Sequence, residues 1–415
     1  MPDELSRNPF KNITFTSPSI PPETGSMKSR PSIALLIESS NSYARGLLRG
    51  IMAYIHEHHS WSIYLPEHGR GNVPVNWLNS WHGDGIIARI ENTKTAEAVV
   101  NSGVPAVDVS AARLAPSLPW VETDDRAIAS LAAQHLIERG FEHYAFCGDH
   151  RFNWSRWRED HFQNVIQEAG FTCHAYPQTA GRKQAPPWEA EQQRLADWIQ
   201  QLPKPVGIMA CYDIKAQQLL DVCRTINVSV PEEVAIIGVD NDEILCNLSE
   251  PPLSSVIPNT RLTGYEAAAL LDRMIAGEPV SSEAHLIKPL GIATRQSTDI
   301  QAIDDKLISD AVRFIRQQAC EGINVQDVLK SVPLSRRVLE SRFQKIIGRS
   351  PHEEIMRIRL DRVKQLLEET ELPLIEIASR TGFRHSEYLN VAFKKQTGTT
   401  PGQFRRQQKH RKLPN

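Results

Sequence analysis

The segment SRRVLESRF, residues 335–343, indicates how the C-terminal part of the chain folds, because its pattern returns fifty positions later as HSEYLNVAF, residues 385–393. An apolar helical run precedes each copy, beginning at Val325 and at Ile375. The following pairs of matching residues stand fifty positions apart: Leu339 and Leu389, Phe343 and Phe393, Lys345 and Lys395, Gly348 and Gly398, Pro351 and Pro401. A repeat this regular indicates one supersecondary unit used twice.

Each copy has the pattern of a helix-turn-helix. In the first copy Pro333 ends the first helix, and Ser335 can cap the second. A long helix from about His352 to Glu369 must join the two copies. Its apolar stripe, which we expect to face both units, consists of Met356, Leu360, Val363 and Leu367.

The second helix of such a unit lies in the major groove of DNA, and its early residues reach base edges. In the first copy the outward residues are Arg336, Arg337, Glu340 and Ser341. In the second copy they are His385, Ser386, Glu387 and Asn390. Arg can grip guanine with two hydrogen bonds, and Asn can do the same for adenine. The alternative is two hairpins that only pack, which explains one copy as well but leaves the duplication unexplained.

The repeat also carries a family resemblance. Its Gly382-Phe383 turn and its closing FKKQTGTTP, residues 393–401, resemble the DNA-binding domain of the arabinose-regulator (AraC) family. The resemblance implies an all-α domain of seven helices with a double helix-turn-helix. Val332 stands where the second copy has Gly382, so we expect a less regular first turn.

Charge is distributed unevenly along the chain. Residues 305–415 hold 22 Lys and Arg against 13 Asp and Glu, a net charge of +9, whereas the rest holds 25 against 36, or -11. A basic C-terminal part on an acidic body indicates a nucleic-acid module joined to a domain of another kind. Lys394 and Arg405 are candidates for phosphate contacts, which supply affinity without sequence preference.

Several classes of protein do not fit the sequence. The six cysteines are scattered without a Cys-x-x-Cys pair, which predicts reduced thiols and a cytoplasmic protein. No apolar run approaches the roughly 18 residues of a membrane span. The cluster HEHH at residues 56–59 matches no zinc motif, and a phosphate-binding glycine loop is absent. We therefore expect no membrane contact, metal site, catalytic residue or cofactor.

From residue 32 the body of the chain alternates short apolar strands with amphipathic helices. Strands are expected at 32–38, 61–65, 85–88, 106–109, 144–147, 207–210, 234–239 and 253–256. Helices are expected at 43–57, 189–201 and 215–226, among others. Strands that are apolar on both faces indicate parallel sheets covered by helices. Because about 265 residues exceed one small sheet, we expect two doubly wound α/β lobes with the chain crossing between them.

Polar residues follow several of these strands, where parallel sheets bind their ligands. The candidates for binding a sugar are Ser39, Trp154, Arg158, Asp213 and Asp240. Carboxylates accept from sugar hydroxyls, Arg donates to them, and indole rings cover the apolar face of a sugar. Ordinary structural roles stay open: the two Asp could cap helices, Arg158 could be a surface charge, and Trp154 could pack between the lobes.

The body resembles the sugar-responsive regulators of the lactose/galactose-repressor (LacI/GalR) group, which are similar to periplasmic sugar-binding proteins. The resemblance rests on IGVD at 237–240, PLSSV at 252–256, and Arg158 three residues before His161-Phe162. It implies a two-lobed fold of the periplasmic-binding-protein type, and it implies that Asp240 and Arg158 contact sugar hydroxyls. His161 stands where that group usually has Gly.

A body of this kind with an AraC-type tail resembles the bacterial xylose-operon regulators, from about residue 33 to 404. That resemblance implies a transcription activator of pentose uptake and catabolism genes with D-xylose as its effector. Its implied partners are double-stranded DNA, RNA polymerase and a second copy of the chain in a cytoplasmic homodimer. Two other classes stay open: an enzyme acting on a sugar phosphate, with Asp213 and Asp240 as acid and base, and a sugar-binding transport protein.

We expect four parts along the chain. They are a disordered leader at 1–30, a sugar-binding sensor at 31–298, a linker at 299–306, and the DNA-binding domain at 307–410.

Overall fold

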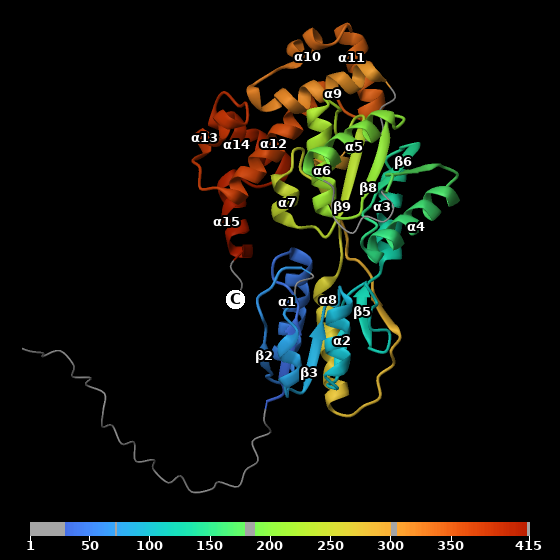
Figure 1. Cartoon of the computed structure of the whole chain (residues 1–415). Coiled ribbons are helices and arrows are strands. Elements are labelled where there is room, and N and C mark those ends of the chain that lie inside the picture. The colour runs from blue at the N-terminus through green and yellow to red at the C-terminus, as the bar shows by residue number, and fades with distance from the viewer. Residues whose placement is uncertain (1–29, 71–72, 179–186, 300–304, 413–415) are drawn as a thin grey trace, which may run out of the picture.

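The computed structural model describes residues 30–70, 73–178, 187–299 and 305–412. Within these ranges two α/β lobes are followed by a group of helices (Figure 1). The leader expected at 1–30 and most of the linker expected at 299–306 lie outside the described residues. None of the described helices is long and apolar enough to cross a membrane.

The first lobe is a parallel sheet of six strands in the order β11-β5-β4-β3-β1-β2. Its elements are β1 (Ser32–Leu36), α1 (Ser42–Glu57), β2 (Ser62–Tyr64), η1 (Asn76–Ser80), β3 (Gly85–Ala88), α2 (Thr93–Asn101), β4 (Ala106–Asp108), β5 (Trp120–Thr123), α8 (Thr260–Ile275) and β11 (Ala284–Ile287). Helices α1 and α8 pack closely. A Cβ on Gly50 would lie 1.9 Å from the carbonyl oxygen of Arg261, so this approach requires glycine.

The second lobe is a sheet of order β12-β10-β9-β8-β6-β7, parallel except for β12, which pairs antiparallel with β10. Its elements are α3 (Asp125–Ile137), β6 (His143–Cys147), α4 (Asn153–Glu168), β7 (Cys173–Ala175), α5 (Trp188–Gln201), β8 (Val206–Ala210), α6 (Asp213–Thr225), β9 (Val234–Val239), α7 (Glu243–Leu248), β10 (Ser254–Ile257), β12 (Gly291–Ala293) and η2 (Gln296–Thr298). Helix α4 runs through His161 without a break.

The described chain passes between the lobes after β5, after β10 and after β11, which confirms the expected two-lobed, doubly wound fold. All eight expected strands are present, but β5, β7, β11 and β12 were not predicted. Strand β5 is fully buried although it contains Glu122 and Thr123, so it lacks the apolar run that reveals a buried strand. The six cysteines are free thiols, as expected.

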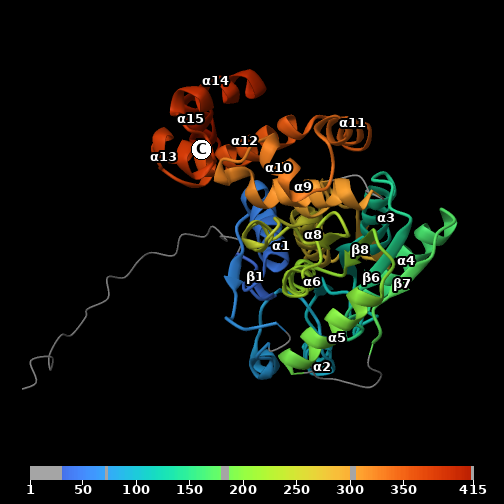
Figure 2. The ribbon, with the colours of Figure 1, turned by 90° about the horizontal axis from the view of Figure 1, so that it is seen from above.

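Seven α-helices make up the described C-terminal part, as the family resemblance implied. They are α9 (Lys306–Gln318), α10 (Val325–Ser331), α11 (Arg336–Ile347), α12 (Pro351–Glu369), α13 (Leu374–Arg380), α14 (Ser386–Thr397) and α15 (Pro401–Lys412), with η3 (Ala319–Glu321) after the first. Seen from above, α9 lies over the body of the molecule while α13, α14 and α15 lie to one side (Figure 2).

The repeat is confirmed as two equivalent helical hairpins. Leu339 and Phe343 of α11 are fully buried, as are their counterparts on α14. Gly348 and Gly398 end these helices in the left-handed region, with φ of 76° and 75°. The two turns differ as expected, because Gly382 has a φ of 73° whereas Val332 is extended.

Helix α12 joins the two hairpins, but the expected role of its apolar stripe is wrong in part. Leu360, Val363 and Leu367 pack only into the core of the second hairpin, with Met356 beside them. The first hairpin instead contacts a separate set on the same helix, Ile355 and Ile358. Two faces of α12 therefore serve the two units, which one stripe cannot do since the units lie on different sides of the helix.

Candidate functional site

A cavity of about 530 Å³ lies between the lobes, at the carboxyl ends of their parallel strands. The first lobe contributes the start of α1, the loops after β2, β3 and β4, and the end of β5. The second lobe contributes α4, the start of α6 and the segment after β9. The lining residues are Ser40, Asn41, Ser42, Tyr43, Arg45, Arg70, Arg89, Ala111, Glu122, Trp154, Arg158, Tyr212, Asp213, Ile214, Asp240, Asp242, Ile244 and Leu245.

Asp240 and Arg158 lie together in this cavity. Burial raises the pKa of Asp240 although the nearby Arg158 charge opposes it, and the carboxylate accepts no hydrogen bond from any described residue. The buried Arg158 donates from Nε to Asp125 Oδ1 (2.7 Å) and from Nη1 to the carbonyl of Cys211 (2.6 Å). Its Nη2 is unused by the described residues. A free carboxylate beside a free N–H can accept from one hydroxyl and donate to another.

Asp213 lines the cavity with only 1% of its surface exposed. Both of its oxygens already accept hydrogen bonds: Oδ1 from the Ser255 hydroxyl (2.6 Å), and Oδ2 from the N–H of Asp242 (2.8 Å) and the thiol of Cys246 (3.4 Å). Burial, followed by the charge of Asp240, raises the pKa of Asp213. Its side chain therefore ties the start of α6 to β10 and α7 while it lines the cavity, and it does not cap α6, whose N-cap is Tyr212.

Trp154 stands in the cavity wall among aromatic and cationic neighbours. Its ring stacks on Phe152 with centroids 5.1 Å apart and meets Tyr212 edge-on at 5.5 Å. The Arg158 guanidinium lies 4.9 Å from its centroid, and Arg70 of the first lobe lies 5.7 Å away. The ring thus lines the cavity and also approaches the opposite lobe.

Ser39 does not line the cavity, which begins at Ser40. Ser39 is exposed, and its carbonyl accepts from Arg45 Nη1 at 3.1 Å. The sharp turn into α1 explains the difference, because Asn41 caps this helix by accepting from the N–H of Ala44. The residues nearest the helix then face the cleft.

Arg89 and Glu122 line the cavity but were not predicted. The Tyr43 hydroxyl donates to Glu122 Oε1, as do the N–H (2.9 Å) and the hydroxyl (3.2 Å) of Thr123, while Oε2 accepts from no described residue. Burial and the neighbouring Asp125 raise the pKa of Glu122 to about 7. The rule that ligands bind beyond strand ends could have found Arg89, which directly follows β3. Nothing marked Glu122, because its strand was not recognised.

The Arg89 guanidinium is held by carboxylates of its own lobe. It pairs with Glu38, and its Nη2 lies 3.4 Å from Glu91 Oε1. Burial opposes its charge, but Glu91 and Glu38 outweigh burial and raise the pKa of Arg89. Arg70 also pairs with Glu91, at 2.9 Å. The cavity therefore presents fixed donors and acceptors of both signs, which suits a small polyhydroxyl ligand. No group of metal-ligating side chains was found among the described residues.

Helix α11 is the first of the two helices that we expect to read a DNA groove, hereafter the groove-reading helices. The residues expected to point outward, Arg336, Arg337 and Ser341, are exposed, and Glu340 is half-buried. Arg336 Nε donates to Glu340 Oε1 at 2.9 Å, whereas Arg337 has no partner among the described residues. Arg337 is therefore the freer of the two cations to meet a base.

Helix α14 is the second helix expected to read a DNA groove. His385 occupies its N-cap position, Ser386 begins it, and Glu387 and Asn390 are exposed on it. Val391 is also exposed, with 65% of its surface accessible. Lys394 is exposed on the same helix. Arg405, the other residue expected to contact a phosphate, donates from Nη2 to the carbonyl of Leu372 at 2.7 Å, which links α15 to the segment between α12 and α13.

The sequence matches three protein-family profiles along its length. They are described as the XylR N-terminal domain over residues 32–126, a periplasmic binding protein-like domain over 133–298, and a helix-turn-helix domain over 329–407. The first two cover the lobes, and the third covers the duplicated hairpins.

Two curated proteins are similar to this chain over nearly all their length. The xylose operon regulatory protein of Escherichia coli K12 is 34% identical over 385 residues, 91% of this chain and 97% of that protein. The protein of the same name from Haemophilus influenzae is 34% identical over 382 residues, 90% of this chain and 97% of that one.

Solved structures show the same likeness. A xylose-binding transcription activator, XylR, superposes with a TM-score of 0.78 at 32% identity, over 91% of this chain and 98% of that one. A complex of the transcriptional regulator CelR with cellobiose superposes with a TM-score of 0.52 at 21% identity, over 65% and 85% of the two chains, a likeness that shows the two-lobed fold alone.

Proposed function

The chain belongs to the family of xylose operon regulatory proteins, and on this basis we propose that D-xylose is the effector bound between its lobes. The protein is a sugar-responsive, DNA-binding transcriptional regulator. It is not an enzyme, since its full-length relatives are regulators, and its helix-turn-helix domain sets aside a transport protein.

The observation that carries the proposal lies in the cleft, where the carboxylate of Asp240 accepts no hydrogen bond from the described residues and Arg158 beside it keeps its Nη2 without a partner among them. Asp240 accepts from a sugar hydroxyl, Arg158 Nη2 donates to a hydroxyl oxygen, and the Trp154 ring covers the apolar face of the sugar. Glu122 Oε2 and Arg89 complete the ring of contacts from the first lobe. Asp213 supports the site by holding the segment that carries Asp240, through its hydrogen bond with the N–H of Asp242. Ser39 does not line the cavity and makes no sugar contact in this proposal.

The sugar acts by favouring the closed arrangement of the lobes. Contacts between lobes already exist, because Arg45 Nη2 lies 3.9 Å from Asp242 Oδ2 and Asn153 Nδ2 donates to the carbonyl of Ala112 at 3.1 Å. A ligand that bonds to both lobes binds the closed form more tightly and shifts the population toward it. Control of transcription requires this difference in affinity, since equal binding to both forms shifts nothing.

The DNA is bound through both hairpins. On α11 the base-reading side chains are Arg336, Arg337, Glu340 and Ser341, and on α14 they are His385, Ser386, Glu387 and Asn390. Lys394 contacts a phosphate. The same family membership supports a cytoplasmic homodimer that activates pentose uptake and catabolism genes by contact with RNA polymerase. It also supports a division into a sensor at 31–298, a linker at 299–306 and a DNA-binding domain at 307–410.

Calorimetry followed by DNA selection tests the proposal. D-xylose, L-arabinose, D-ribose and D-glucose are titrated into the full chain, and the chain then selects fragments from a random DNA library with and without the tightest sugar. We expect heat with D-xylose above all, and a selected sequence whose affinity depends on xylose. Heat with a different pentose alone would reject xylose, and no heat with any sugar would reject the sensor function itself.

A further inference from the structure

We propose that residues 295–299 form a coupling segment that transmits the state of the sugar cleft to the DNA-binding domain, with Asp299 and Arg357 as its positioning residues. The inference rests on the proposed function, because it needs a sugar that changes DNA affinity. The segment leaves β12 and leads toward α9, so it is the described stretch that lies nearest the passage between sensor and tail.

One end of the coupling segment reaches the cleft. Arg295 Nη2 donates to Asn241 Oδ1 at 2.9 Å, and Asn241 directly follows the sugar candidate Asp240. Arg295 Nε also donates to Asn247 Oδ1 on α7 (3.2 Å), and Nη1 to the carbonyl of Leu253 (2.9 Å). If sugar binding shifts the segment after β9, the side-chain amide of Asn241 therefore moves Arg295 with it.

Helix α3 makes a second connection between the cleft and the segment. Its first residue, Asp125, accepts from Arg158 in the cavity wall. Near its other end, His135 Nε2 lies 2.7 Å from Thr298 Oγ1, and Arg139 Nε donates to the carbonyl of Thr298 at 2.5 Å. Thr298 is fully buried and also donates to Ser254 Oγ at 2.7 Å, so a movement of α3 moves the segment with it.

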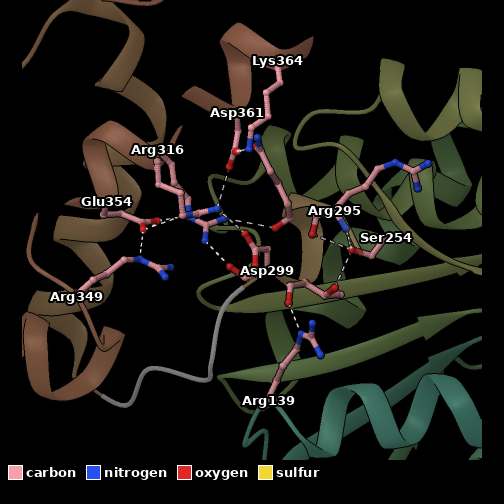
Figure 3. A network of polar contacts seen from close by, with 12 residues as sticks. Arg139, Ser254, Arg295, Asp299, Arg316, Arg349, Glu354, Asp361 and Lys364 are labelled. Atoms are coloured by element: carbon pink, nitrogen blue, oxygen red, sulfur yellow. Dashed lines mark hydrogen bonds and ion pairs between the residues drawn. The ribbon is translucent and has the colours of Figure 1, made fainter. Parts of the chain in front are cut away.

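The other end of the coupling segment is held by the DNA-binding domain (Figure 3). Arg357 Nη1 on α12 donates to Asp299 Oδ2 at 2.7 Å. Arg316 Nη2 on α9 donates to the carbonyl of Asp299 at 2.8 Å, and its Nε lies 3.0 Å from Glu232 Oε1 of the second lobe. Arg313, on the same helix, donates from Nη1 to the Ser229 hydroxyl at 2.8 Å.

These contacts specify position more than they add stability. Glu232 and Glu354 are nearly fully buried, and Glu354 is shared by Arg357 (2.8 Å) and Arg349 (2.5 Å). Desolvating buried charges costs about as much as their pairing returns, so such pairs are better at fixing one geometry than at stabilising a fold. An interface built of them favours a single orientation and loses it when one charge moves.

The point of attachment controls both groove-reading helices. Among the described residues, hydrogen bonds and ion pairs from the DNA-binding domain to the sensor come from α9, and those to Asp299 come from α9 and α12. Arg357 lies on α12 between Ile355 and Ile358, which pack on the first hairpin, and about one turn before Leu360, which packs on the second. Turning α12 at Arg357 therefore moves α11 and α14 together.

The test measures the coupling between sugar and DNA in the full chain. Asp299→Ala removes one end of the ion pair from a carboxylate that is 41% exposed, so the fold is retained. Arg357→Lys keeps a charge for Glu354, but a single ammonium cannot serve Asp299 and Glu354 in a forked geometry. The matched control is Arg224→Ala, which deletes an exposed ion pair with Asp221 on α6 of the same lobe.

Affinity for the selected DNA fragment is measured with and without D-xylose by fluorescence anisotropy, and D-xylose affinity with and without DNA by calorimetry. The two ratios must agree in the wild type, because coupling is reciprocal, and we expect a factor in the range of about 5 to 150. In both variants and in the double variant we expect the ratio to fall to within about twofold of unity, with the double no worse than either single. The affinity for each ligand in the absence of the other stays within about fivefold of the wild type, the most an exposed ion pair contributes.

Three outcomes overturn the inference while leaving the proposed function intact. The first is a ratio of affinities with and without the second ligand that stays at the wild-type value in Asp299→Ala. The second is an equal loss of this ratio in the control Arg224→Ala. The third is a loss of D-xylose affinity in the absence of DNA by more than about fivefold in Asp299→Ala. If the wild type shows sugar binding but no ratio, the proposed sugar-controlled function fails and the coupling segment fails with it.

Discussion

Asp240 and Asp213 are neighbouring buried carboxylates, and exchanging each for its amide should separate binding from stability. Asp240 accepts from no described residue, so its bonding capacity is reserved for the ligand. Asp213 accepts from Ser255, from the backbone of Asp242 and from Cys246. Asp240→Asn should therefore weaken sugar binding alone, and Asp213→Asn should weaken the fold.

The magnitudes follow from the kind of hydrogen bond that is lost. A bond from a hydroxyl to a charged acceptor contributes about 1.5–3 kcal/mol, so Asp240→Asn should weaken D-xylose binding roughly 10- to 150-fold. Its stability should stay level or rise, because the exchange removes a carboxylate whose pKa is raised by burial. In Asp213→Asn an NH₂ replaces one acceptor, which leaves a buried donor unmet at a cost of about 1–3 kcal/mol.

Calorimetry with D-xylose and thermal unfolding without sugar measure the two effects in the same preparations. Each kcal/mol should lower the Tm by about 2–4 °C in a unit of this size. Two results would contradict the roles given to these carboxylates: Asp240→Asn binds D-xylose as the wild type does, or it lowers the Tm of the sugar-free protein as far as Asp213→Asn.

Three further predictions concern single side chains. Because burial raises the pKa of Glu122 to about 7 from 4.5, the folded state holds a proton that the unfolded chain loses, so the wild type loses stability as pH rises through that window. Glu122→Gln should thus gain stability relative to wild type as the pH rises from 4.5 to about 7, by about 1.4 kcal/mol per pH unit in urea unfolding; a constant difference would contradict this. Gly382→Ala should unfold the DNA-binding domain more easily than Gly348→Ala, since both have positive φ but only at Gly382 would a Cβ meet backbone atoms, at 2.8 Å; equal Tm values would count against it. Asn390→Ala should relax base preference at one position by about 1–3 kcal/mol, while Lys394→Ala weakens binding to all sequences alike, and a binding array on operator variants that shows the reverse pattern would exchange these roles.

The architecture was predictable because it depends on patterns that repeat within a few residues. Strands that are apolar on both faces predicted the two α/β lobes, and the repeat at an interval of fifty residues predicted the two helical hairpins. Strand β5 was not predicted because Glu122 and Thr123 interrupt its apolar run. The burial of these two polar side chains is compensated by the hydrogen bonds between them and by the one from Tyr43. That compensation comes from a residue 79 positions away, which no local pattern contains.

The amino-acid sequence was enough to predict that Asp213 and Asp240 lie at the carboxyl ends of strands, because each closely follows an apolar strand, and the family resemblance added Arg158. What each of these side chains bonds to became clear only from the folded chain. Ser255, 42 positions from Asp213, occupies that carboxylate, whereas nothing in the described chain occupies Asp240. The physical reason is that burial and hydrogen bonding are properties of neighbours in space, so identical side chains in similar sequence positions acquire different chemistry once the lobes have packed.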